Sequence, residues 1–206
     1  MKNIDLSLYL VTDNSENEEK FLKTIEEAIL GGVTVVQIRE KTAETLDFYN
    51  LAVKVKEITA RYDVPLIIND RVDVALAIDA DGVHVGQSDM PCDVTRRLIG
   101  EDKILGVSAA TIEEAKKAEN DGADYIGTGA VFPTKTKKDA ESVTKKDLSD
   151  IAKSINIPVV AIGGITIENA GELKDTGIAG LSVVSAIMSA DDPKKASKKL
   201  LNIFNS

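Results

Sequence analysis

One pattern recurs along this chain and limits what it can fold into. A short apolar run, rich in Val and Ile and suited to a buried strand, is followed by a longer segment with helical spacing. Several of the helical segments run into Gly just before the next apolar run, where Gly can end a helix in the left-handed conformation. The eight apolar runs cover residues 6–12, 33–40, 65–70, 82–86, 103–108, 124–129, 158–164 and 180–187.

Eight alternating strand and helix segments predict an α/β protein, specifically a single (β/α)₈ TIM barrel spanning residues 1–206. A doubly wound sheet has the same periodicity and is the alternative. No linker or low-complexity stretch divides the chain, so eight units in 206 residues favour a closed barrel with tight loops. Within residues 44–62, the spacing of Leu46, Tyr49, Val53 and Lys56 predicts the buried face of one helix.

Composition limits the partners and the compartment. The 34 acidic and 25 basic residues give a net charge of −9, which argues against nucleic acid but allows small phosphorylated ligands. Cys92 is the only cysteine, so no internal disulfide forms and a reducing compartment fits. The first residues, MKNIDLSLYLVTD, resemble neither a signal peptide nor a membrane span. We expect a cytoplasmic protein with no membrane partner, and a homo-oligomer is compatible with this composition.

Polar side chains gather where the second apolar run ends. In VVQIREK (35–41), Gln37, Arg39 and Lys41 are two residues apart, so in an extended chain they share one face, while Val36 and Ile38 take the other. In a barrel, the carboxyl ends of the strands carry the chemistry. Three long donors on one face there predict a polar or anionic ligand, and a strand end fraying into solvent is the alternative.

Two carboxylates follow the next two runs. Asn69 and Asp70 end residues 65–70, and Asp89 follows residues 82–86. Helix caps or turns would explain each of them alone. Two carboxylates after adjacent strands can also share one cation, and Mg²⁺ is typically held by one or two carboxylates plus phosphate oxygens. We therefore predict one Mg²⁺ per subunit at Asp70 and Asp89.

Other candidates are pocket residues or phosphate contacts. The only histidine, His84, alternates with valines, so it is expected to face the barrel interior, as is Tyr9. Ser108 ends the fifth run and could bind a ligand or cap a helix. Gly163-Gly164 and Val184-Ser185 end the last two runs, where such barrels usually bind phosphate, although a tight turn is the alternative for the glycines.

The stretch GTGAVFPTKTKKDAESVT (127–144) gathers positive charge in an acidic chain. Lys135, Lys137 and Lys138 lie within four residues, and threonines alternate with the first two of them. Either this is a solvated loop or it holds an anion. Alternating hydroxyls and cations after the sixth strand suit two neighbouring phosphate groups.

Taken in order, these motifs resemble the thiamine phosphate synthase (thiamine-phosphate diphosphorylase) family. The resemblance runs through LYLVTD, VQIREK, IINDRVDVALAIDADGVHVGQSD, ILGVSA, DYIGTGAVFPTKTK, PVVAIGGI and SVVSAI. It implies a (β/α)₈ barrel that uses Mg²⁺. It also implies a transferase of thiamine biosynthesis that joins a pyrimidine methyl diphosphate to a thiazole phosphate and releases pyrophosphate.

The resemblance also assigns roles to residues of this chain. For the pyrimidine diphosphate it implies Tyr9, Gln37, Ile38, Arg39, Glu40, Lys41, Asn69, His84, Ser108 and Lys137. For the thiazole phosphate it implies Thr134, Lys135, Thr136, Gly164, Val184 and Ser185. Within these sets Arg39, Lys41 and Lys137 are the catalytic cations that stabilise the leaving pyrophosphate, and Asp70 and Asp89 match the magnesium ligands.

Other functions remain as alternatives. A paralogous family, similar to thiazole tautomerases, uses a histidine just after the strand end where this chain has Ala109-Ala110. An isomerase or aldolase of sugar phosphates could use the same barrel. A non-catalytic barrel that binds phosphorylated ligands would not need two aspartates beside a diphosphate site.

Overall fold

Short parallel strands close into a barrel in chain order. The computed structural model describes residues 4–13, 17–134 and 142–206, and within them eight strands pair in sequence, with β8 returning to β1. The strands are β1 Leu8–Val11, β2 Val35–Ile38, β3 Leu66–Asn69, β4 Gly82–Val85, β5 Ile104–Ser108, β6 Tyr125–Thr128, β7 Val159–Ile162 and β8 Gly180–Val183. The predicted (β/α)₈ barrel is confirmed, and the doubly wound alternative is wrong because the sheet closes on itself.

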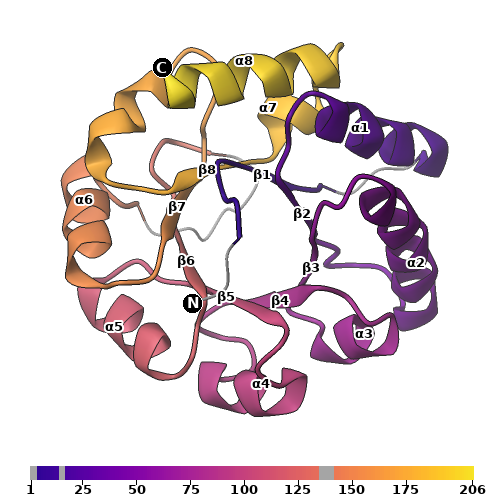
Figure 1. Ribbon diagram of the computed structural model, residues 1–206, viewed down its shortest axis with the longest axis horizontal. Helices are drawn as coiled ribbons and strands as arrows, with labels where there is room; N and C mark the ends of the chain where they lie inside the picture. The colour runs from indigo at the N-terminus through magenta and orange to yellow at the C-terminus, as the bar shows by residue number, and fades with distance from the viewer. Residues whose placement is uncertain (1–3, 14–16, 135–141) are drawn as a thin grey trace.

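The helices form a ring outside the strands (Figure 1). In the described part of the chain they are α1 Glu18–Leu30, α2 Thr45–Arg61, α3 Val72–Ala77, α4 Cys92–Ile99, α5 Ile112–Asn120, α6 Lys145–Ser154, the 3₁₀ helix η1 Ala170–Thr176, α7 Ser185–Met188 and α8 Pro193–Asn205. None of the helices in these residues is both long and apolar enough to cross a membrane.

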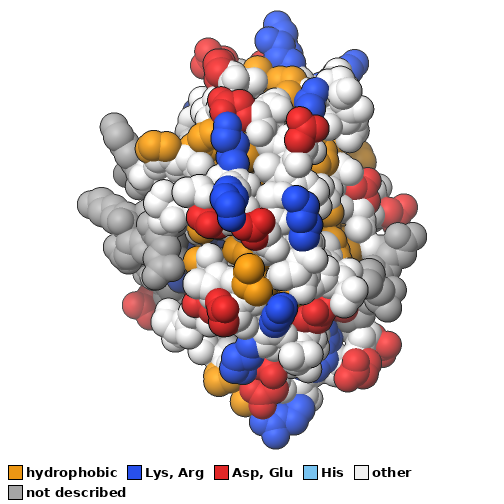
Figure 2. Space-filling view, turned by 90° about the vertical axis from the view of Figure 1, so that its left-hand side faces the viewer, with side chains coloured by type: hydrophobic (Ala, Val, Ile, Leu, Met, Phe, Trp, Pro, Cys, Tyr) orange, Lys and Arg blue, Asp and Glu red, His pale blue; other side chains and the backbone are white. Residues whose placement is uncertain are grey.

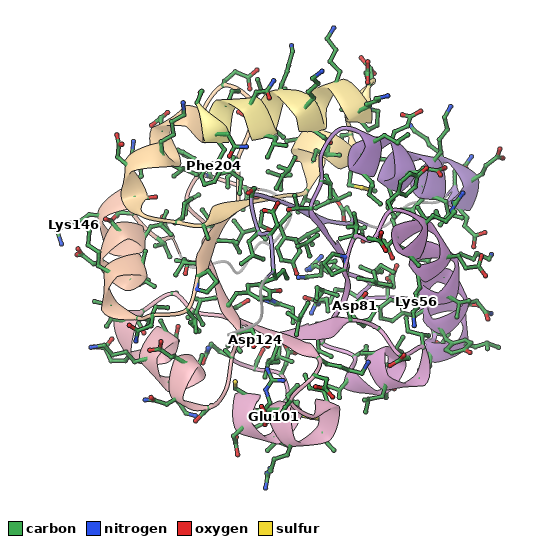
Figure 3. The ribbon with its side chains drawn as sticks, in the orientation of Figure 1. Lys56, Asp81, Glu101, Asp124, Lys146 and Phe204 are labelled. Atoms are coloured by element: carbon green, nitrogen blue, oxygen red, sulfur yellow. The ribbon has the colours of Figure 1, made fainter. Side chains whose placement is uncertain are left out.

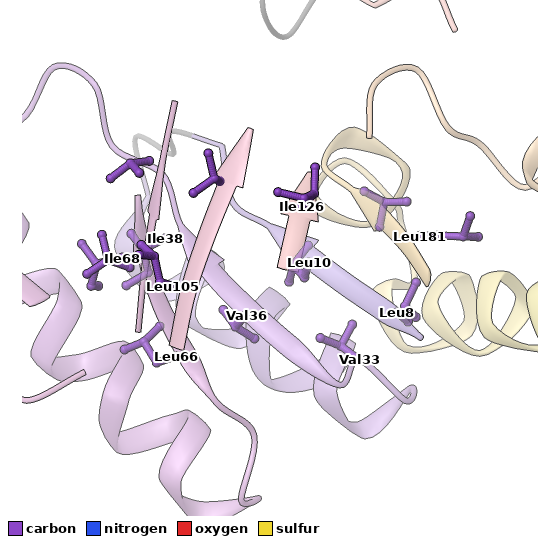
Figure 4. Packing of buried hydrophobic residues seen from close by; sticks show 14 of the residues in the cluster. Leu8, Leu10, Val33, Val36, Ile38, Leu66, Ile68, Leu105, Ile126 and Leu181 are labelled. Atoms are coloured by element: carbon purple, nitrogen blue, oxygen red, sulfur yellow. The ribbon is translucent and has the colours of Figure 1, made fainter. Parts of the chain in front are cut away.

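Side-chain alternation along each strand separates two cores. Outward residues such as Leu8 and Leu10 pack under the helices, and Figure 4 shows part of this layer around β1, β2 and β3. Inward residues fill the barrel with a second, smaller cluster: Leu6, Tyr9, Val11, Val35, Ile67, Tyr125 and Val160. Each such buried apolar side chain contributes roughly 1.5–3 kcal/mol relative to an exposed one.

The interior of the barrel changes from apolar to polar along the strand direction. On β2 the inward residues are Val35 and then Gln37, and on β3 they are Ile67 and then Asn69. The β3–β4 register pairs Asn69 with His84, the last inward residue of β4. The barrel therefore has an apolar floor and a polar mouth at the carboxyl ends of its strands.

The predicted buried face of α2 is wrong. Leu46 is 67% exposed and Tyr49 is 37% exposed, and both lie on the outer side of the helix. The face that packs on the barrel carries Phe48, Ala52, Val55, Ile58 and Thr59. Both sets have helical spacing, but only the observed set avoids a charged residue, whereas the predicted one ends on Lys56.

Charge on the outer surface is mixed. On the side of the molecule seen in Figure 2, Lys and Arg side chains are interspersed with Asp and Glu side chains. The acidic excess of the sequence is therefore not gathered into one field on that side.

The amino ends of the strands are tied together by a buried ion pair. Arg96 on α4 contacts Asp124, the residue before β6, with an Nη2–Oδ2 distance of 2.7 Å. The guanidinium also donates to the backbone carbonyls of Gly100, Lys103 and Gly122. Asp124 in turn accepts the Leu105 N–H at 2.8 Å, so this cluster joins α4, β5 and β6.

A second carboxylate holds the neighbouring strands in a similar way. Asp81, just before β4, accepts the N–H of Leu66 at the start of β3 at 2.8 Å. Figure 3 labels Asp81 and Asp124, and both lie close to the strands, inside the ring of helices. The amino end of the barrel is thus fixed by carboxylates that bind backbone N–H groups.

Replacing Arg96 tests the energetic weight of this cluster. We expect Arg96→Ala to lower the free energy of unfolding by about 3 kcal/mol, because it leaves the Asp124 carboxylate buried without its cation. Urea denaturation followed by circular dichroism measures this change. The matched control is Arg97→Ala, since Arg97 is exposed and lies 3.7 Å from Asp93. The control should cost about 0.5 kcal/mol or less, and equal losses in the two variants would contradict the assignment.

Candidate active site

A large cavity opens at the polar mouth of the barrel. Its volume is about 750 Å³, within the range of small-molecule sites. Its walls include most of the residues that the sequence singles out: Tyr9, Gln37, Arg39, Lys41, Asn69, Asp70, His84, Asp89, Ser108, Thr134, Gly164, Val184 and Ser185. The structure thus brings together these side chains from strands β1 to β5 and from the loops at the carboxyl end of the barrel, and the whole lining draws on all eight strands.

Of the other five sequence-derived residues, two line a different cavity and three lie outside the described part of the chain. Lys135, Thr136 and Lys137 lie outside the described residues. Ile38 and Glu40 line a smaller neighbouring cavity of about 170 Å³ instead. The Ile38 side chain is fully buried in the outer apolar core, so it faces away from the barrel interior.

Glu40 holds the turn after β2. Its Oε1 accepts the backbone N–H groups of Thr42 and Ala43 at 2.8 and 3.1 Å and the Thr42 hydroxyl at 3.0 Å. Burial alone would raise the pKa of Glu40, but these hydrogen bonds lower it below its ordinary value. The carboxylate therefore orders the backbone that carries Lys41 into the main cavity.

Two carboxylates meet at the ends of β3 and β4. Asp70 follows β3 in the left-handed region, with φ of +61°, a conformation that Asp tolerates better than most residues. Its N–H donates to the His84 carbonyl at 2.8 Å, which fixes it against β4. Asp89 accepts the Gly86 N–H at 2.8 Å, and its carboxylate is close enough to raise the pKa of Asp70. The cap alternative does not hold for Asp70, because the N-cap position of α3 is Arg71.

The electrostatics of this pair favour a cation. Burial raises the pKa of Asp70, and the nearby Asp89 carboxylate raises it further. The Lys41 ammonium opposes both effects by donating to the Asp70 carboxylate. Oxygen ligands of this kind suit Mg²⁺. Among the described residues no third His, Cys, Asp or Glu completes a metal cluster, so a cation here would need oxygens from water or from a ligand.

A chain of hydrogen bonds crosses the cavity floor. Gln37 Nε2 lies 2.7 Å from Tyr9 Oη, which lies 2.6 Å from Tyr125 Oη. Tyr125 Oη lies 3.0 Å from His84 Nδ1, and His84 Nε2 lies 2.9 Å from Ser108 Oγ. These five side chains come from five different strands, and all of them line the cavity.

Tyr125 is a cavity residue with several contacts in the site that sequence reasoning missed. It is fully buried and opens β6, two residues before Gly127 on the same face. Most of the candidate residues lie at the carboxyl ends of the strands, whereas Tyr125 reaches the cavity from the amino end because its side chain is long. Its alternation with Ile126 was the available signal.

Glycine brings two loops together on the far side of the barrel from β3 and β4. Gly164, after β7, has φ of +66°, and a Cβ there would lie 2.5 Å from the Pro133 carbonyl oxygen. Only glycine fits this contact between the loops after β6 and β7. Thr134, Gly164, Val184 and Ser185 consequently border the same side of the cavity.

Comparison with known proteins points to one family. A family model described as thiamine monophosphate synthase matches residues 8–187. The thiamine-phosphate synthase of Methanobrevibacter smithii is 72% identical over 206 residues, covering 100% of this chain and 99% of that one. The thiamine-phosphate synthase of Clostridium tetani is 55% identical, covering 99% and 98%. The solved thiamine phosphate pyrophosphorylase of Pyrococcus furiosus superposes with a TM-score of 0.88 at 42% identity, covering 98% of this chain and 96% of that one.

The lowered pKa of Glu40 gives a pH-dependent prediction. A lowered folded pKa stabilises the protein above the ordinary carboxyl pKa, and this contribution is lost as the pH falls through the lowered value. We expect Glu40→Gln to reduce the free energy of unfolding by only about 0.5 kcal/mol at neutral pH, because the carboxylate is largely solvated. Urea denaturation at a series of pH values should show this difference vanish at about pH 3.

The matched control is Glu44→Gln. Glu44 stands at the start of α2 and makes no side-chain capping bond there. Its substitution should leave the pH dependence of the wild type unchanged. A Glu40→Gln deficit that stays constant from neutral to acidic pH would contradict the role given to the carboxylate.

Proposed function

This chain belongs to the thiamine monophosphate synthase family, and on that premise we propose that its cavity binds an aminopyrimidine methyl diphosphate and a thiazole phosphate together. Relatives are thiamine-phosphate synthases, and the chain is accordingly a transferase of thiamine biosynthesis. The observation that carries the substrate assignment is the division of one cavity into two sides. Asp70, Asp89, Arg39 and Lys41 border one side, and the loop contact at Gly164 borders the other.

The pyrimidine diphosphate occupies the side bounded by β2 to β5 in this proposal. Gln37, Asn69 and Ser108 offer polar contacts, and Arg39 and Lys41 offer positive charge for the diphosphate. Lys137 is a third cation in the proposal, although it lies outside the described residues. The backbone of Ile38 and Glu40 carries these groups, since the two side chains themselves point elsewhere.

The thiazole phosphate occupies the opposite side. Thr134 ends the described part of the loop after β6, and Gly164, Val184 and Ser185 follow β7 and β8. The loops after strands seven and eight are the usual phosphate site of this fold. Lys135 and Thr136 belong to the same proposed subsite and lie outside the described residues.

Asp70 and Asp89 would hold one Mg²⁺ per subunit. Their proximity and the approach of Lys41 to Asp70 support a site that favours positive charge. When bound, Mg²⁺ would neutralise charge that develops on the pyrophosphate leaving group.

The protein's own residues would assist a dissociative substitution. The bond that breaks joins the methylene carbon to a diphosphate oxygen, and the aminopyrimidine can donate electrons to the resulting cation. Arg39 and Lys41 would stabilise the departing pyrophosphate. The thiazole nitrogen already has a free lone pair to form the new C–N bond, so the reaction needs no general base. His84 contacts Tyr125 and Ser108 in the floor of the cavity, which supports a structural use of this histidine.

Pyrophosphate release tests this function directly. The purified protein is mixed with both phosphorylated substrates, with and without Mg²⁺, and released pyrophosphate is measured. We expect release only when both substrates and Mg²⁺ are present. Omission of either substrate is the control. Absence of release from the complete mixture would reject the synthase and favour a tautomerase-like or non-catalytic phosphate-binding barrel.

Replacing Asp70 tests the metal assignment. We expect Asp70→Asn to lower the Mg²⁺-dependent kcat at least about 100-fold. The variant would lose a ligand for Mg²⁺, and with it the positive charge that Mg²⁺ would place at the leaving group. Steady-state kinetics over a range of Mg²⁺ concentrations measures it. Asp73→Asn is the matched control, since Asp73 is exposed and pairs with Arg71 on the outer surface. Asp73→Asn should keep the wild-type kcat, and an Asp70→Asn enzyme with normal Mg²⁺ dependence would overturn the assignment.

Cys92 gives no sign of a catalytic role, and its free, buried thiol supports a reducing compartment. The thiol is free, and burial raises its pKa to about 11, so it stays protonated at neutral pH. A free buried thiol fits a reducing environment, and we place the protein in the cytoplasm on this ground.

A further inference from the structure

The hydrogen bonds across the cavity floor have only one arrangement in which the protons of both phenols, Tyr9 and Tyr125, have an acceptor. A phenol oxygen has a single proton, so it donates to one partner and accepts from the others. The partners of Tyr9 are Gln37 and Tyr125, and those of Tyr125 are Tyr9, Gln37 and His84. Burial raises the pKa of both Tyr9 and Tyr125 above the usual value, so both oxygens keep their protons at neutral pH. The direction of the bond at one end of the chain therefore determines the direction of every later bond.

Gln37 sets that direction. The amide nitrogen Nε2 faces Tyr9 and can only donate. Tyr9 then donates to Tyr125, and Tyr125 donates to His84 Nδ1. A neutral imidazole that accepts at Nδ1 carries its proton on Nε2, and that proton goes to Ser108 Oγ. The Ser108 hydroxyl proton is left to point into the cavity.

We propose that Tyr125 is a positioning residue: it holds His84 as the Nε2–H tautomer and thereby makes Ser108 a hydrogen-bond donor to the bound substrate. The identity of that substrate, the pyrimidine diphosphate, rests on the proposed function. The direction of the hydrogen bonds does not rest on the proposed function, because it follows from contacts within the protein itself. Ser108 consequently offers its proton to an acceptor atom of the ligand, a ring nitrogen or a phosphate oxygen.

The backbone is shaped to allow the central contact of this chain. A Cβ at Gly106 on β5 would lie 2.3 Å from Tyr125 Oη and 2.5 Å from His84 Nδ1. Any larger residue there would push apart the two atoms that must share a proton. The rings of Tyr9 and His84 flank Tyr125 at centroid distances of 5.7 and 5.6 Å. Tyr125 is thus fixed by packing as well as by hydrogen bonds.

Nuclear magnetic resonance can determine the direction of the hydrogen bonds from the signals of the His84 ring, without overlap from other histidines. The chain has a single histidine, so protein labelled with ¹⁵N-histidine gives the signals of one imidazole ring. We expect long-range ¹H–¹⁵N correlations of the wild type to show a protonated Nε2 and an unprotonated Nδ1. A wild-type ring protonated on Nδ1 would overturn the proposal, because the chain would then run from Ser108 toward Gln37.

Tyr125→Phe tests the positioning role, since it removes one oxygen and keeps the ring. We expect the preference for the Nε2–H tautomer to be lost and kcat/KM for the pyrimidine diphosphate to fall about tenfold, the effect of one neutral hydrogen bond. The matched control is Tyr49→Phe on the outer face of α2, which should change neither reading. An unchanged tautomer in Tyr125→Phe would overturn the role of this phenol.

The two readouts separate this proposal from the proposed function. If the wild type releases no pyrophosphate yet shows the Nε2–H tautomer, the function fails and the chain polarity stands. If pyrophosphate is released but the ring is protonated on Nδ1, the function stands and this inference fails. The wild-type spectrum needs no variant, so it decides the polarity even if Tyr125→Phe does not fold.

Discussion

The alternation of side chains along parallel strands is the constraint on which the rest of this structure depends. Each strand has only about two inward positions, so one fills the apolar floor and the next reaches the mouth. Outward positions are taken by residues such as Leu8 and Ile38, which bind the helices to the barrel. The cavity is therefore built mainly from the last inward residues of the strands and the loops that follow them, and the long side chains of Tyr9 and Tyr125 reach it from deeper in the barrel.

Much of this arrangement could be predicted from the sequence, because strands and their ends carry distinct residue types. Apolar runs located the strands, and the polar residues that end them, such as Gln37 and Asn69, line the cavity. The buried face of α2 was predicted wrongly, since two sets of residues had helical spacing and the chosen set included the charged Lys56. Whether Asp70 caps a helix or faces a ligand was also undecidable, because the same residue type serves both purposes. Tyr125 escaped notice because the length of its side chain, rather than its position, brings it to the site.

An acidic protein that handles anionic substrates must concentrate positive charge locally. In this cavity the positive charge lies directly beside negative charge: Lys41 donates to the Asp70 carboxylate, and the nearby Asp89 carboxylate raises the pKa of Asp70. Under the proposed function, such a mixture would let one region of the cavity accept both a cation and a diphosphate without a large net field. The neutral chain from Gln37 to Ser108 then contributes direction rather than charge, which suits recognition of an uncharged ring.

The ion pair of Arg96 and Asp124 lies at the amino end of the barrel, while the candidate ligand contacts among the described residues gather at the carboxyl end. The strands thus work as spacers between an anchoring end and a reactive end. Loops at the mouth can exchange residues, and so change substrate preference, without disturbing the bonds that keep the strands in register. The two ends of the barrel therefore have different roles. Substitutions at the mouth suit changes of substrate preference, and substitutions at the amino end suit changes of stability.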